Sequence, residues 1–278
     1  MKKSAICCSL LIALLFTMGC NQQKPVKVFT GHKSYVNAVD VTSDGKFLAS
    51  GSSDNSIKIW DIESGKWLKT LEHHKQRINF VLFFDQGNKL LSSGGDSKFL
   101  IWDVNKEKII NQRISKTGQF VDLKLSGNEK FIAAIEQNVK NNKHNLQIIN
   151  TEGAQMEKSI SNTQNKCAIS PDNQKIYYAK NGKIMFYDKK RGQSYIFTEA
   201  KKRKPLCISG NGKYLALIPE GFSTYFVEII DLETKEAINK IDLLSSNIMH
   251  YRPATFLPDN QFIAIPAGNS LHIYHAST

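Results

Sequence analysis

Residues 31–61 read GHKSYVNAVDVTSDGKFLASGSSDNSIKIWD, and residues 73–103 read HHKQRINFVLFFDQGNKLLSSGGDSKFLIWD. The two stretches align without a gap. Four pairs of identical residues share a spacing of 42, namely His32 and His74, Gly45 and Gly87, Asp54 and Asp96, and Trp60 and Trp102. A repeat of this length indicates a fold built by stacking copies of one supersecondary unit.

Each copy has the pattern of four short strands separated by turns. In the first copy the expected strands cover residues 36–41, 47–50, 57–60 and 67–71. Serine, aspartate, asparagine and glycine cluster between them, as turns require. A single four-stranded antiparallel sheet cannot bury both faces, so several sheets must pack side by side.

The turn after the first strand recurs along the whole chain. It begins at residues 43, 85, 127, 171, 210 and 258, which gives six repeats. Residues 26–29 precede the first repeat and have no partner of their own, so we expect them to supply the fourth strand of the last sheet. That strand would close the structure and remove exposed sheet edges.

Gly31-His32 and Trp60-Asp61 resemble the signature pairs of the WD-repeat family. The resemblance implies an all-β fold, a single six-bladed β-propeller over residues 26–278; a seven-bladed or incomplete propeller is the alternative. It is strong over residues 31–103 and weak over 104–278, where spacing alone supports the repeats. It also implies two hydrogen-bonded tetrads: His32, Ser50, Asp54 and Trp60, and His74, Ser92, Asp96 and Trp102.

The first twenty residues have the layout of an export signal. Two lysines precede an apolar run over residues 5–18, which is shorter than the roughly 20 residues that span a bilayer. Gly19-Cys20 resembles the lipobox of bacterial lipoproteins, although Thr17 stands where that family prefers leucine. The resemblance implies a signal peptide over residues 1–19, lipidation of Cys20 and a tether over 20–25. Secretion without lipid is the alternative.

The same resemblance implies where the protein resides. It would be exported and held at a bacterial membrane by lipid, and Asn21 after the cysteine favours the outer membrane, facing the periplasm, by resemblance to enteric lipoproteins. Cys167 and Cys207 remain after processing. Alignment of the repeats places both cysteines in first strands, but at positions whose side chains point to opposite faces of the sheet. We therefore expect two thiols rather than a disulfide.

Sequence signatures of catalysis are missing: there is no GxSxG, HExxH, CxxC or Walker loop. His73 and His74 are adjacent, and neighbouring side chains of a strand point to opposite faces, which disfavours a metal site. We therefore expect a non-catalytic protein-interaction scaffold without metal or cofactor. A propeller hydrolase or metal-dependent enzyme of the cell envelope is the alternative.

Binding is expected at the loops that precede the first strands. The alignment predicts a row of equivalent positions there: Tyr35, Arg77, Gln119, Thr163, Lys202 and His250. The run Lys201, Lys202, Arg203 and Lys204 should lie on the same face. With a formal net charge of +12, this face suits an acidic protein segment or an anionic envelope polymer. A lysine-rich solvated rim is the alternative, and export argues against a nucleic acid partner.

Overall fold

The computed structural model describes residues 27–219, 226–242, 255–257, 260–267 and 270–276. The expected signal peptide, Cys20 and His250 lie outside these residues. The chain divides into two compact units, Met1–Gly31 and His32–Thr278, and the strands that the structure describes belong to the second. The described residues include no helix with the length and apolar character needed to cross a bilayer.

The first three sheets each contain four strands. The first holds β1 (Val36–Val41), β2 (Phe47–Ser52), β3 (Ser56–Asp61) and β4 (Trp67–Glu72). The second holds β5 (Ile78–Phe84), β6 (Lys89–Gly94), β7 (Lys98–Asp103) and β8 (Lys108–Ile114), with a short 3-10 helix, η1 (Asp85–Gly87), after β5. The third holds β9 (Gly118–Leu125), β10 (Phe131–Asn138), β11 (His144–Asn150) and β12 (Met156–Thr163).

Two further sheets are also four-stranded. The fourth holds β13 (Cys167–Ile169), β14 (Lys175–Lys180), β15 (Lys183–Asp188) and β16 (Gln193–Glu199). The fifth holds β17 (Arg203–Ile208), β18 (Tyr214–Pro219), β19 (Phe226–Asp231) and β20 (Ala237–Asp242). The described part of the sixth sheet has three strands, β21 (Thr255–Phe256), β22 (Phe262–Ala267) and β23 (Ser270–His275).

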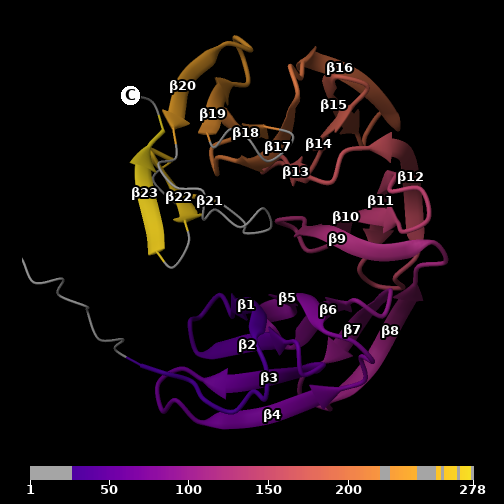
Figure 1. Ribbon diagram of the computed structural model, residues 1–278, viewed down its shortest axis with the longest axis vertical. Coiled ribbons are helices and arrows are strands. Elements are labelled where there is room, and N and C mark those ends of the chain that lie inside the picture. The colour runs from indigo at the N-terminus through magenta and orange to yellow at the C-terminus, as the bar shows by residue number, and fades with distance from the viewer. Residues whose placement is uncertain (1–26, 220–225, 243–254, 258–259, 268–269, 277–278) are drawn as a thin grey trace, which may run out of the picture. The chain divides into compact units, whose positions relative to one another are not determined.

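In every sheet, consecutive strands of the chain pair antiparallel with each other. In Figure 1 the colour runs from indigo at the first sheet to yellow at the sixth. The prediction of an all-β, propeller-like fold of repeated sheets is confirmed. The structure does not show the strand expected at residues 26–29: among the described residues before His32, none forms a strand. The Val28 side chain is 64% exposed, so burial does not stabilise a strand there. A closed propeller of six blades stays a prediction.

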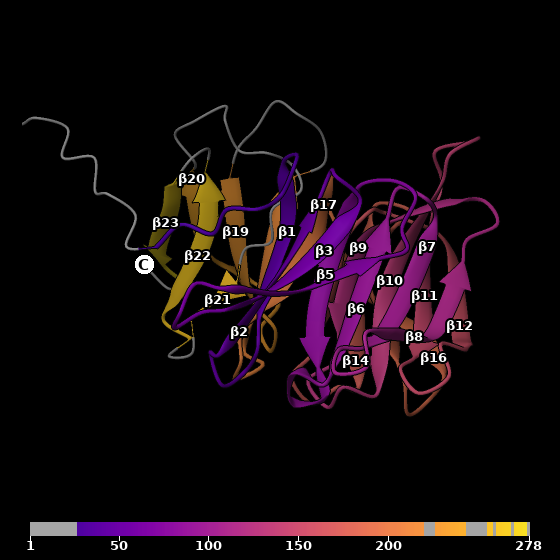
Figure 2. The ribbon, with the colours of Figure 1, turned by 90° about the horizontal axis from the view of Figure 1, so that it is seen from below.

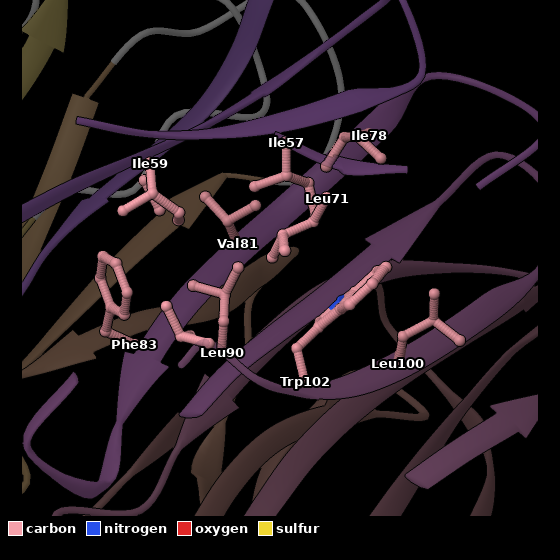
Figure 3. Packing of buried hydrophobic residues seen from close by; sticks show 11 residues of the cluster. Ile57, Ile59, Leu71, Ile78, Val81, Phe83, Leu90, Leu100 and Trp102 are labelled. Atoms are coloured by element: carbon pink, nitrogen blue, oxygen red, sulfur yellow. The ribbon is translucent and has the colours of Figure 1, made fainter. Parts of the chain in front are cut away.

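The packing between the first two sheets shows how the unit is stabilised (Figure 3). Ile57 and Leu71 of the first sheet belong to one hydrophobic cluster with Ile78 and Leu90 of the second, and all four are buried. Burying an aliphatic side chain of this size contributes about 1.5–3 kcal/mol. Similar clusters join each later pair of sheets, so the core is a series of interfaces between sheets.

Side chains also join neighbouring sheets through the turns after their first strands. In three of these turns a residue with positive φ accepts a backbone N–H from the preceding turn. The pairs are Glu129 with the Asp85 amide (2.8 Å), Asn173 with the Gly127 amide (2.6 Å) and Asn260 with the Asn211 amide (3.0 Å). These bonds fix adjacent sheets to each other at the end that carries these turns.

Candidate functional site

The first expected tetrad forms one continuous chain of hydrogen bonds. His32 Nδ1 lies 2.9 Å from Asp54, His32 Nε2 lies 2.8 Å from Ser50 Oγ, and the Trp60 indole N–H donates to Ser50 Oγ at 2.8 Å. A neutral imidazole protonated at Nδ1 satisfies all three contacts, because the serine hydroxyl then donates to Nε2. The Lys33 amide also donates to Asp54, at 2.8 Å, which ties the preceding loop to the tetrad.

The second tetrad repeats this geometry and is more deeply buried. His74 lies 2.9 Å from both Asp96 and Ser92, and the Trp102 indole donates to Ser92 at 2.8 Å. Burial lowers the pKa of His74, so this imidazole is neutral at pH 7. Burial alone would raise the pKa of Asp96, but the Lys75 amide and His74 outweigh it and leave that pKa below its ordinary value. The pair is therefore a neutral histidine and a carboxylate.

The tetrads hold the loops that carry Tyr35 and Arg77. The Tyr35 carbonyl accepts the Ser53 amide at 2.8 Å, and the Arg77 carbonyl accepts the Gly95 amide at 2.9 Å. Both side chains are nevertheless exposed, Tyr35 to 83%. The fixed backbone and free side chain make these two residues suitable for contacting a partner.

The four residues of the basic run at the start of the fifth sheet, 201–204, differ in exposure and in hydrogen bonding. Lys201 and Lys202 are exposed on a turn with positive φ at both residues. Arg203 does not point outward as expected: its Nε donates to the Ala200 carbonyl at 3.1 Å and its guanidinium pairs with Glu228. Lys204 is half-buried and donates to Asn165 Oδ1 at 2.7 Å. Only the first two lysines of the run are exposed.

Two further positions of the expected row depart from the prediction. Thr163 is 5% exposed and Gln119 is half-buried, so neither presents a free side chain as Tyr35 does. A bulge at Asn162, which has positive φ, carries Thr163 across from His144 and into the sheet. The backbone irregularity, rather than residue type, sets this orientation.

Exposed charges are unequally distributed between the two ends of the sheets. We call the loops that precede the first strand of a sheet, or join its second strand to its third, the upper loops. The remaining loops are the lower loops. The upper loops lie at the top of Figure 2 and the lower loops at the bottom. In the described upper loops (32–35, 53–55, 73–77, 95–97, 115–117, 139–143, 164–166, 181–182, 200–202) every exposed Lys, Arg, Asp or Glu is a cation. These are Lys33, Lys75, Arg77, Lys116, Lys140, Lys143, Lys201 and Lys202.

The lower loops carry both signs of charge. Their exposed carboxylates include Asp44, Glu63, Asp85, Glu107, Glu129, Glu152, Asp172, Glu233 and Glu236, alongside lysines such as Lys66 and Lys190. The two carboxylates of the described upper loops, Asp54 and Asp96, are the tetrad groups bonded to histidine. Exposed carboxylates stand beside these loops, at Glu72, Glu199 and Asp242, which end the fourth strands of the first, fourth and fifth sheets. Cations therefore predominate at the upper end, and within the described upper loops all exposed charges are positive, whereas the lower loops themselves carry both signs.

A buried ion pair joins β9 of the third sheet to Lys166, which directly precedes β13 of the fourth sheet. Lys166 Nζ lies 3.0 Å from Asp122, whose other oxygen accepts the Cys167 amide at 3.1 Å. Both Cys167 and Cys207 are free thiols, and burial raises the pKa of Cys207 to about 12. Within the part of the chain that the structure describes, no three His, Cys, Asp or Glu residues cluster as metal ligands would.

The third sheet has a polar network where the tetrad residues are missing. Glu136, 6% exposed, accepts hydrogen bonds from Ser115, Thr117 and Gln147. It lies two repeat periods after Ser52. The signal in the sequence for this network is a glutamate within the otherwise apolar stretch that begins at Phe131.

Two segments of the chain, residues 23–61 and 65–103, match the family described as WD domain, G-beta repeat. Ribosome assembly protein 4 of Saccharomyces cerevisiae is 47% identical over 47 residues, which is 17% of this chain and 9% of that protein. WD repeat-containing protein 18 of Mus musculus is 42% identical over 50 residues, 18% of this chain and 12% of that protein. The matches thus span about a tenth of these relatives.

Solved structures show the same fold over most of the chain. A chain in the crystal structure of a mitotic checkpoint complex aligns with a TM-score of 0.74 at 17% identity, covering 90% of this chain and 79% of that chain. Hydrazine synthase of Kuenenia stuttgartiensis aligns with a TM-score of 0.69 at 15% identity, covering 87% and 84%. At these identities the likeness establishes the propeller fold and nothing about activity.

Proposed function

We propose that this protein is a non-catalytic interaction platform, tethered to a bacterial membrane, whose upper loops bind an acidic protein segment or an anionic polymer of the cell envelope. The observation that carries the proposal is the one-sign charge of the described upper loops. Propellers with WD repeats typically serve as protein-interaction scaffolds, which supports a protein as the partner.

The charge distribution suits capture of an anion. The eight exposed cations of the described upper loops outnumber the exposed carboxylates beside them, Glu72, Glu199 and Asp242, so this end would attract and orient an acidic partner more strongly than the mixed lower loops. Tyr35 and Arg77 add side chains of the types that dominate binding energy at protein interfaces. Electrostatics would bring the partner to the upper loops, and these two anchors would hold it there.

The proposed tether rests on the N-terminal sequence. Lipid on Cys20 would hold the protein at the membrane, and residues 20–25 would link it to the propeller. One acyl chain gives only marginal membrane binding, whereas several chains give stable anchoring. Export to the envelope would also keep the basic loops away from nucleic acid, so that their partner is a protein or an envelope polymer.

One fractionation and capture experiment tests both parts of the proposal. Full-length protein is crosslinked in native membranes, and the recovered partner is quantified. Cys20→Ser should move the protein to the soluble fraction. Lys201→Glu with Lys202→Glu should leave it in the membrane but reduce partner recovery on the order of tenfold, because attraction becomes repulsion.

The matched control reverses two exposed lysines of the lower loops, Lys66→Glu with Lys190→Glu. It makes the same change in net charge and should leave partner recovery unaltered. Equal losses from the two pairs would show a general charge effect, and full recovery from the upper pair would refute the basic face. Membrane retention of Cys20→Ser would refute the lipid tether.

A further inference from the structure

The first strand of the first sheet has one covered side and one uncovered side. On the covered side, Ala38 packs against the cluster shared with the second sheet, and the Asp40 carboxylate accepts the Phe83 amide at 2.6 Å. Successive side chains of a strand point to opposite faces, so Val39 and Val41 lie on the other side. They are 61% and 44% exposed. The side of β1 that faces away from the second sheet is therefore apolar and open to solvent.

Residues at the position of Val39 in the following sheets are buried. Val39 stands four residues before the turn that begins at residue 43, and the same position in the second, third and fourth sheets is occupied by Val81, Leu123 and Cys167. All three are buried, each in a cluster that it shares with the preceding sheet. Val39 differs because no sheet formed by the described residues covers this side of β1.

The sixth sheet leaves the complementary position uncovered. In the first three sheets an isoleucine of the third strand packs towards the following sheet, in the cluster that holds the Val39 equivalent of that sheet; these are Ile59, Ile101 and Ile148. All three are buried. Ile273 lies opposite Ala264 as Ile59 lies opposite Ala49, so it has the same place in the sixth sheet. Ile273 is nevertheless 57% exposed.

Lys58 shares the uncovered side of the first sheet but does not place a free charge on it. Ser50 lies directly opposite both Val39 and Lys58, and opposed residues of antiparallel strands share one face. The Lys58 side chain is buried, and its ammonium lies 3.2 Å from the centroid of the Trp67 ring and donates to Thr70 at 3.2 Å. The surface that remains open around Val39 is therefore apolar.

We propose that the uncovered side of the sixth sheet packs against the uncovered side of the first sheet in a second copy of this protein, with Ile273 against Val39. The same packing between consecutive sheets occurs three times within the chain, so these two free faces are complementary. The end units of repeat arrays need polar outer faces to stay soluble, whereas both of these are apolar.

A second copy is the occupant because it presents both faces at once. The two faces differ, so the contact is heterologous, running from the sixth sheet of one copy to the first sheet of the next. The strand expected to close the structure on itself is not formed among the described residues before His32, and both faces are exposed in the presence of each other. This contact lies apart from the upper loops and does not require the acidic partner.

Disulfide trapping between two chains tests the contact. One full-length chain carries Val39→Cys and another carries Ile273→Cys, each with Cys20→Ser to remove the N-terminal thiol, and the two are mixed and oxidised. A linked dimer should form on the order of tenfold more than when Ile114→Cys replaces Ile273→Cys, because packing holds the two thiols together. Ile114 lies on the outer strand β8 and is 56% exposed, so it matches Ile273 in residue type and exposure.

Sedimentation of the Cys20→Ser chain provides an independent measurement. Its average mass should rise with concentration. Ile273→Asp should raise the dissociation constant about tenfold or more, because the contact would bury an unpaired carboxylate. Ile114→Asp makes the same substitution outside the contact and should leave the concentration dependence unchanged.

A chain with both Val39→Cys and Ile273→Cys distinguishes a second copy from closure within one chain. A bond inside that chain, with no linked dimer in the mixture of single variants, would overturn the proposal and indicate that the first and sixth sheets close on each other. Equal dimer yields with Ile273→Cys and Ile114→Cys, or an average mass that does not change with concentration, would also overturn it.

Discussion

Replacing Asp96 with alanine is expected to lower the free energy of unfolding by about 3 kcal/mol. The carboxylate accepts hydrogen bonds from His74 Nδ1 at 2.9 Å, the Lys75 amide at 2.9 Å and the Lys98 amide at 3.2 Å. Alanine leaves the buried imidazole N–H without its acceptor and removes the link between two upper loops. Most of the cost comes from these orphaned donors rather than from the lost carboxylate itself.

Equilibrium urea denaturation of the two proteins provides this measurement, and Asp242→Ala is the control. Asp242 is exposed and has a surface ion pair with Lys240 at 3.2 Å, so its removal should cost under about 0.5 kcal/mol. If Asp96→Ala is no more destabilising than Asp242→Ala, then the tetrad does not stabilise the second sheet.

Replacing Lys166 with methionine should be similarly costly, about 3–5 kcal/mol. Burial alone would raise the pKa of Asp122, but Lys166, and then Lys124, hold it below its ordinary value. Asp122 is therefore charged when Lys166 is present. Without Lys166, Asp122 must either stay ionised with Lys124 as its remaining nearby cation or take up a proton, and both destabilise the folded protein.

The double variant Asp122→Leu with Lys166→Met distinguishes a buried charge from a general packing defect. Removing both charges should recover part of the loss, because a well-packed apolar pair can replace a buried ion pair, although Lys124 also loses the carboxylate that raises its pKa. Additive losses from the two substitutions would contradict this account. Lys183→Met, which breaks a surface pair with Glu199, should cost under about 1 kcal/mol in the same denaturation assay.

The sequence allowed the strands and tetrads to be placed because identical residues recur at one spacing. His74, Asp96 and Trp102 stand 42 residues after His32, Asp54 and Trp60, so the same hydrogen-bonded arrangement could be predicted for both sets. The closing strand could not be predicted from apolar residues alone. Whether a short segment forms an edge strand depends on a pairing partner and on burial, which a local pattern does not contain.

The orientation of side chains at the upper end depended on contacts between distant residues. Arg203 turns inward because it pairs with Glu228 of β19, two strands away in the same sheet, and Thr163 is buried because a bulge shifts the register of β12. Neither feature follows from residue type or repeat position. Sequence reasoning could assign these residues to the correct loops, but not decide which of them reach solvent.

Site-specific photo-crosslinking in native membranes tests the central claim most directly. A photoreactive residue replaces Tyr35 in the upper loops or, as a control, Ile196 on the outer strand β16, where the side chain is also exposed. We expect a discrete crosslinked partner from position 35 and none from position 196. A partner captured from position 196 but not from position 35 would contradict the claim that the upper loops are the binding face.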